Sequence, residues 1–157
     1  MFFLKKLFSI NPNKISEINP GKKNLLIAYL LLECAMSDGI LKEIEAKHIK
    51  KLLKEKMDLI DSEIENIFNL AKEYSGESIE IYSLTKEIRD NFQKDEILEI
   101  FQFMWEIVLA DKNIDDFESM LMSKATGLFH LTGKESAKAK RNAMDSLGLS
   151  DLQTLRN

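Results

Sequence analysis

The hydrophobic residues of this chain recur at spacings of three and four, with short polar breaks between the apolar runs. Such spacing places them on one face of an α-helix. Two runs, 24–37 and 95–110, are apolar almost all round, so we expect these two helices to lie at the centre of the molecule. No stretch alternates for long enough to predict a strand. The pattern predicts an all-α compact bundle of about seven helices, at about 20–38, 42–55, 61–75, 78–92, 95–110, 116–130 and 132–148.

Several helix starts have recognisable signals. Pro20 after an asparagine fits the first position of a helix, and Asp61 fits the residue that caps the third helix. Thr132 followed three residues later by glutamate is a capping-box pattern. In the second helix, the residues expected to face inward, opposite the lysines, are Ile44, His48, Ile49, Leu52 and Leu53.

The composition is that of one domain. The chain has 157 residues, a net charge of −4 and a single cysteine, so its core forms without disulfides or Cys-rich zinc sites. We expect a single helical domain over residues 20–157 in a cytoplasmic protein. We expect no nucleic-acid partner, because the mildly acidic balance provides no basic footprint.

Residues 1–19 form a separate apolar and basic segment. It is too short to cross a membrane and lacks the pattern of a secretory signal. We expect it to dock back onto the domain, with peripheral contact to a membrane surface as the alternative. Its apolar residues are Phe2, Phe3, Leu7 and Phe8, and its lysines are Lys5 and Lys6.

An internal repeat aligns the first two helices with the fifth and sixth at an offset of 73 residues. Each half has an apolar helix with one embedded glutamate, an aspartate where the helix breaks, an aliphatic residue three positions on, and a second glutamate seven residues after the aspartate. The aligned pairs are Glu33 with Glu106, Asp38 with Asp111, Leu41 with Ile114, and Glu45 with Glu118.

These acids break local rules in both halves. Asp38 and Asp111 stand at the carboxyl end of a helix, where the macrodipole disfavours negative charge, and Glu33 and Glu106 are embedded in apolar helices. A hard divalent cation such as Ca²⁺ or Mg²⁺ would compensate them, although the pattern is not that of an EF-hand. The alternatives are ordinary turns, a capping box formed by Asp115 and Glu118, and ion pairs across the bundle.

Two other chemistries were weighed. Glu45 and His48 have the Glu-x-x-His spacing of di-iron helical bundles, but the second half has Leu121 where a matching histidine is needed. Cys34 lies in an apolar helix and is expected to be an inert core thiol. No Gly-rich phosphate loop or nucleophile elbow is present, so we expect no enzymatic activity.

At the repeat the sequence resembles the TerB family, the all-helical domain associated with tellurite resistance and related to the amino-terminal region of membrane-anchored DnaJ-type co-chaperones. The resemblance rests on residues 33–45 (ECAMSDGILKEIE) and 104–132 (MWEIVLADKNIDDFESMLMSKATGLFHLT), and it extends over about 25–143. The second copy is similar to a subgroup of stand-alone TerB-like proteins. Lys112 stands where the family prefers glycine, and its ammonium group beside Asp111 would replace a cation or repel one, which leaves the first half as the better candidate for a metal.

The resemblance implies a bundle of two similar halves that acts as a binding or scaffolding protein in tellurite-type stress response. It implies a divalent cation as the cofactor and a protein as the partner. The candidate metal ligands are Asp38, Glu45, Asp111 and Glu118, with Glu33 and Glu106 as inner-shell or second-shell acids. The alternative function is a peripheral membrane or complex-assembly module that uses the amino-terminal apolar residues and the lysine face formed by Lys47, Lys50, Lys51, Lys54 and Lys56.

Overall fold

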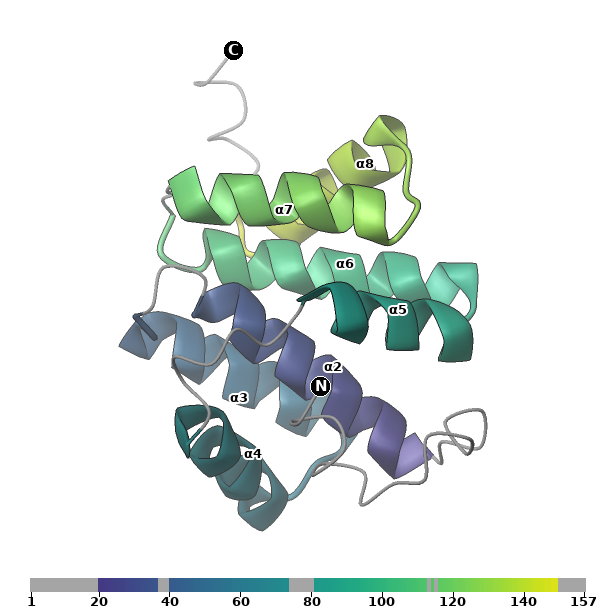
Figure 1. The fold of residues 1–157 in the computed structure, drawn as a ribbon. Helices are drawn as coiled ribbons and strands as arrows, with labels where there is room; N and C mark the ends of the chain where they lie inside the picture. Colours follow the sequence, from purple (N-terminus) through teal and green to yellow (C-terminus); the bar gives the residue numbers. More distant parts are fainter. Residues whose placement is uncertain (1–19, 37–39, 74–80, 113, 115, 150–157) are drawn as a thin grey trace.

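A computed structural model describes residues 20–36, 40–73, 81–112, 114 and 116–149; for 20–25 and 70–73 it describes the backbone alone. Seven helices account for most of these residues, and no strand occurs among them (Figure 1). The predicted all-α class is therefore confirmed. The helices are α2 (Pro20–Ala35), α3 (Glu43–Met57), α4 (Asp61–Glu73), α5 (Ile81–Asn91), α6 (Lys94–Leu109), α7 (Asp116–Leu128) and α8 (Gly133–Ser146).

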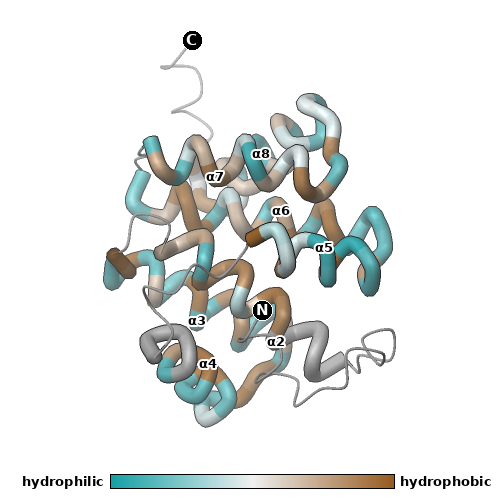
Figure 2. The backbone as a smooth tube through the Cα atoms, in the orientation of Figure 1, coloured by the Kyte–Doolittle hydropathy of each residue, from teal (hydrophilic) through white to brown (hydrophobic). Residues whose placement is uncertain are grey.

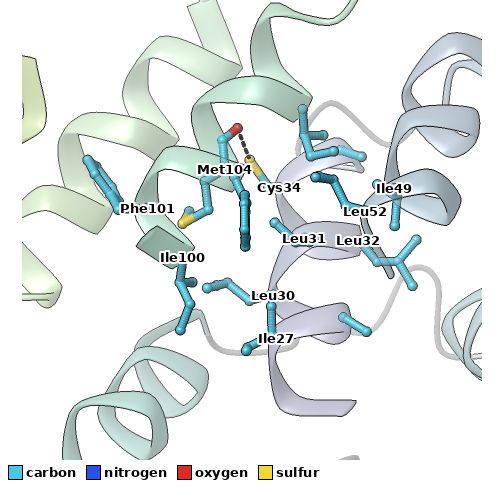
Figure 3. Close-up of a cluster of buried hydrophobic side chains, with 14 of the residues drawn as sticks. Ile27, Leu30, Leu31, Leu32, Cys34, Ile49, Leu52, Ile100, Phe101 and Met104 are labelled. Atoms are coloured by element: carbon cyan, nitrogen blue, oxygen red, sulfur yellow. Dashed lines mark hydrogen bonds between the residues drawn. The ribbon is translucent and has the colours of Figure 1, made fainter. Parts of the chain in front are cut away.

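Helix α2 lies in the middle of the bundle and contacts α3, α4, α5 and α6. Residues 26–32 are all buried, which explains why this helix is apolar on every side. Figure 3 shows Leu30 on the side of Ile100 in α6, while Leu32 lies toward α3. Each fully buried leucine of this kind contributes about 1.5–3 kcal/mol, so α2 is the main hydrophobic element of the fold.

Helix α6 is the second central element, as the sequence predicts. Its buried residues run continuously from Phe103 to Leu109, and it packs against α2, α3, α7 and α8. Figure 2 shows hydrophobic residues gathered along the interior helices and hydrophilic ones on the outer turns of α5. The core is thus built around the pair α2 and α6.

The helices of the two halves begin and end at equivalent positions to within two residues. Adding the offset of 73 to Glu43, the first residue of α3, gives Asp116, the first residue of α7. Helices α4 and α8 also coincide to within one residue, although their buried positions differ in register. The carboxyl ends of α2 and α6 and the amino ends of α3 and α7 lie at one end of the bundle, on the left in Figure 1.

Two local expectations are wrong. Ile44 is exposed, and Glu45 is buried in its place, because Glu45 shares the helix face that packs on α2 and α6. The predicted burial of Ile49, Leu52 and Leu53 is confirmed. Asp61 is the first residue of α4 rather than its cap. The carboxylate that serves this helix start is Glu63, which accepts a hydrogen bond from the Ile60 backbone N–H at 3.2 Å.

The capping box predicted at Thr132 is confirmed. The Glu135 N–H donates to Thr132 Oγ1 at 3.1 Å, and the Thr132 N–H donates to Glu135 Oε1 at 2.9 Å. These bonds satisfy two backbone donors that the first turn of α8 would otherwise leave open.

Replacing Thr132 by alanine should lower the free energy of unfolding by about 1 kcal/mol, because the Glu135 N–H loses its acceptor. Chemical denaturation measures the loss. The control is Thr132→Ser, which keeps the hydroxyl and should change stability by only a few tenths of a kcal/mol. Equal losses in the two variants would contradict the assigned role of the cap.

Candidate functional site at the paired helix ends

Three of the predicted acids are almost fully buried. Glu45 is 2% exposed, Glu118 is 2% exposed and Glu106 is 4% exposed. Glu45 and Glu118 hold equivalent places in the two halves, near the start of α3 and of α7. Asp38, the remaining ligand predicted for the first half, lies outside the described residues. A buried carboxylate costs several kcal/mol unless a cation or hydrogen-bond donors compensate it, so the surroundings of these groups decide their role.

A lysine from the first half reaches the aspartate of the second. Lys42 Nζ donates to Asp111 Oδ2 at 2.5 Å, across 69 residues of sequence. Lys42 occupies the N-cap position of α3 without capping it through its side chain, so its side chain is free to extend to the turn after α6. The hydrogen bond to Asp111 and the nearby charges of Asp111, Glu118 and Glu45 raise the pKa of Lys42, against an opposing effect of desolvation.

This ammonium group therefore lies within the field of three carboxylates that come from α3, α7 and the turn after α6. The sequence hypothesis placed Lys112 beside Asp111 as the cation that replaces or repels a metal. The structure pairs Lys42 with Asp111, while the side chain of Lys112 is exposed on a left-handed residue with φ of 64°. The repeat aligns Lys42 with Asp115, and this reversal of charge was the sequence signal for its role.

Glu106 is held by a different set of groups. Its Oε1 lies 3.3 Å from His48 Nε2 of α3, and Ser146 Oγ of α8 donates to the same oxygen at 3.3 Å. Sequence reasoning left His48 as a packed helix residue and did not connect it with Glu106. The two residues are 58 positions apart, and only the packing of α3 on α6 brings them together.

Glu33, the equivalent of Glu106, has no such partner among the described residues. It is partly buried and lines an open groove of about 540 Å³ with Ile81 of α5 and residues of α7, among them Phe117, Met120 and Leu121. Desolvation by burial raises the pKa of Glu33 from 4.5 to about 7. This carboxyl is thus poised to change its charge near neutral pH.

The donors fit a hard cation in kind, since Asp and Glu oxygens are the ligands that Ca²⁺ and Mg²⁺ prefer. Within the described residues, which leave out Asp38, no three His, Cys, Asp or Glu side chains gather closely enough to hold a metal ion. Around Asp111 a cation would meet the ammonium group of Lys42. The geometry provides a cation-attracting centre in which a lysine already takes part.

The family model of the tellurite resistance protein TerB matches residues 24–141, three quarters of the chain. The chain belongs to the TerB family. The match agrees with the resemblance found at the repeat and includes every acid of the candidate site. No curated protein and no solved structure gives a significant match to this TerB chain.

The single cysteine of the TerB domain lies in the core beside the candidate site. Cys34 is fully buried, and its Sγ lies 3.7 Å from the carbonyl oxygen of Met104, to which it donates (Figure 3). Burial raises the pKa of the thiol, and the charges of Glu118, Glu45 and Glu33 raise it further. A thiol held in its protonated form is a poor nucleophile, which agrees with the expected inert role.

Part of the lysine face is engaged within the TerB domain. Lys50 Nζ lies 4.9 Å from the centre of the Phe68 ring, and Lys54 forms an ion pair with Asp61 at 3.1 Å. Both contacts join α3 to α4. None of the described helices combines the length and the apolar character that crossing a membrane requires. The amino-terminal segment expected to contact a membrane lies outside the described residues.

Proposed function

We propose that this TerB-family chain is a non-enzymatic binding protein that takes up a divalent cation, Ca²⁺ or Mg²⁺, at the paired helix ends and acts in a tellurite-type stress response. The observation that supports the proposal is that the ammonium group of Lys42 pairs with Asp111 and lies near enough to Glu118 and Glu45 for their charges to raise its pKa. These carboxylates come from both halves of the repeat, so a cation bound among them links the halves.

Lys42 is the intramolecular competitor in this proposal. Its side chain is about one third exposed, so the ammonium group can leave Asp111 without disturbing the core. A divalent cation brings twice the charge to the same oxygens and prefers carboxylate ligands. Binding then amounts to exchange of Lys42 for the metal, with Asp38 as the further ligand expected from the repeat.

The test is a titration of the full-length protein with CaCl₂ or MgCl₂, followed by amide chemical shifts. In Lys42→Met the competing charge is gone, and we expect the metal to bind at least tenfold more tightly than in the unmodified protein, with shifts near Asp111 and Glu118. The matched control is Lys47→Met, which removes an exposed lysine from the same helix and should leave the affinity unchanged.

Thermal unfolding provides a second readout that does not depend on assignments. Lys42→Met removes the ammonium group that pairs with Asp111 and lies near Glu118 and Glu45, so the variant should be less stable in chelator and should recover in millimolar Ca²⁺. Adding Asp111→Asn should abolish this recovery. Absence of shifts and of recovery in Lys42→Met at millimolar metal would refute the proposal.

A further inference from the structure

The two halves of the repeat differ at one pair of equivalent contacts. In the second half, Glu106 of α6 meets His48 of α3 at 3.3 Å. The offset of 73 relates Glu106 to Glu33 and His48 to Leu121, and both Glu33 and Leu121 line the groove beside α7. Glu106 therefore contacts a ring nitrogen of His48. At Glu33 the equivalent position holds the aliphatic side chain of Leu121, and the carboxyl faces an open groove.

The groove has the character of a docking surface. Phe117 and Met120 are 62% and 71% exposed, and they line it one helical turn apart on α7. Ser119 and Ser123 are small, and Lys124 is the only lysine among the described residues that line the groove. Large apolar side chains exposed beside a recessed carboxyl are typical of a surface that a partner covers.

The charge of Glu33 indicates what the partner brings. Glu33 is partly buried in the groove, and no side chain among the described residues forms an ion pair with it, so its carboxyl is desolvated there without a compensating cation. A positively charged side chain inserted from outside would do for Glu33 what an internal donor does for Glu106. Such a charge-assisted hydrogen bond, once covered by apolar groups, contributes about 1.5–3 kcal/mol.

We propose that the groove between α7, α5 and α2 binds an apolar helical segment of a partner protein, with a Lys or Arg of that segment paired to Glu33 and its apolar residues packed on Phe117 and Met120. This site is separate from the cation site at Lys42. It is a protein-binding surface, and its residues indicate the chemistry of the partner that fits it.

The probe is a synthetic amphipathic peptide of Leu and Lys residues at helical spacing, with a fluorescent label. Its control peptide has Gln in place of each Lys. Binding to the full-length protein is measured by fluorescence anisotropy at pH 8, where Glu33 is ionised. Glu33→Gln should weaken binding of the Lys peptide about tenfold and leave that of the Gln peptide unchanged. Met120→Ser should weaken both peptides, because it removes apolar contact area.

Matched controls separate this site from the general acidity of the chain. Glu65→Gln removes an exposed carboxylate from α4 and should leave the affinity for both peptides unchanged. Equal affinity of the Lys peptide for Glu33→Gln and the unmodified protein would overturn the proposal. Loss of binding in Asp111→Asn with none in Glu33→Gln would also overturn it, since the peptide would then occupy the cation site.

Discussion

Replacing Phe101 by alanine is expected to lower the free energy of unfolding by about 4 kcal/mol, the largest effect of any substitution considered for this chain. Phe101 is fully buried on α6, and its ring meets two other rings edge to face. The ring centroid of Trp105 lies 6.4 Å away, and that of Phe129, which follows α7, lies 6.1 Å away. Truncation removes these contacts and leaves a cavity in the centre of the bundle.

Denaturant unfolding followed by circular dichroism measures this loss. Phe117→Ala is the matched control, because Phe117 is exposed on α7 and its truncation should change stability by less than about 1 kcal/mol. Phe101→Leu fills part of the cavity and should fall between the two. Similar losses for Phe101→Ala and Phe117→Ala would contradict the assignment of the core.

Replacing Glu33 by glutamine is expected to stabilise the protein by about 2 kcal/mol at pH 8. The pKa of Glu33 is about 7 in the folded chain against an ordinary value of 4.5, so the folded state binds the proton more tightly than the unfolded state. The stabilisation of the folded state by the protonated Glu33 carboxyl is fully present below pH 4.5 and is lost as the pH rises through 7. The pKa difference between 4.5 and about 7 corresponds to a cost of about 3 kcal/mol for ionised Glu33, and the partial exposure of the side chain reduces this cost.

The measurement is the difference in unfolding free energy between Glu33→Gln and the unmodified protein at pH 5 and at pH 8. Glutamine removes the charge and keeps the shape, so the gain should shrink to about 0.5 kcal/mol or less at pH 5. Glu65→Gln, at an exposed position on α4, should change stability by less than about 0.5 kcal/mol at both values. A gain for Glu33→Gln that is the same at both pH values would show that its carboxyl is not desolvated.

The same substitution connects stability with binding. If a cationic partner covers Glu33, the stability lost at pH 8 returns when the complex forms, because the partner supplies the missing charge. A carboxyl that destabilises the free protein and contributes to binding is typical of functional positions. Glu33→Gln should therefore be the more stable protein and the weaker binder.

The sequence by itself determined the secondary structure, the central place of α2 and α6, and the two-fold repeat. These properties depend on local patterns: apolar spacing along each helix, the capping box at Thr132, and the residues that recur at an offset of 73. It also predicted that Glu33 and Glu106 would be embedded in apolar helices, and Glu106 is buried while Glu33 is partly buried. The match to the TerB model follows from the same pattern.

Only the tertiary structure decided which group each acid meets. The sequence pattern directed Ile44 inward and placed Lys112 beside Asp111, whereas packing buried Glu45 and brought Lys42 to Asp111 from 69 residues away. Helical spacing specifies a face to within about a residue, and it carries no information about the partner across the bundle. Glu106 meets His48 because α3 packs on α6, whereas Glu33 faces an open groove that residues of α5 and α7 line.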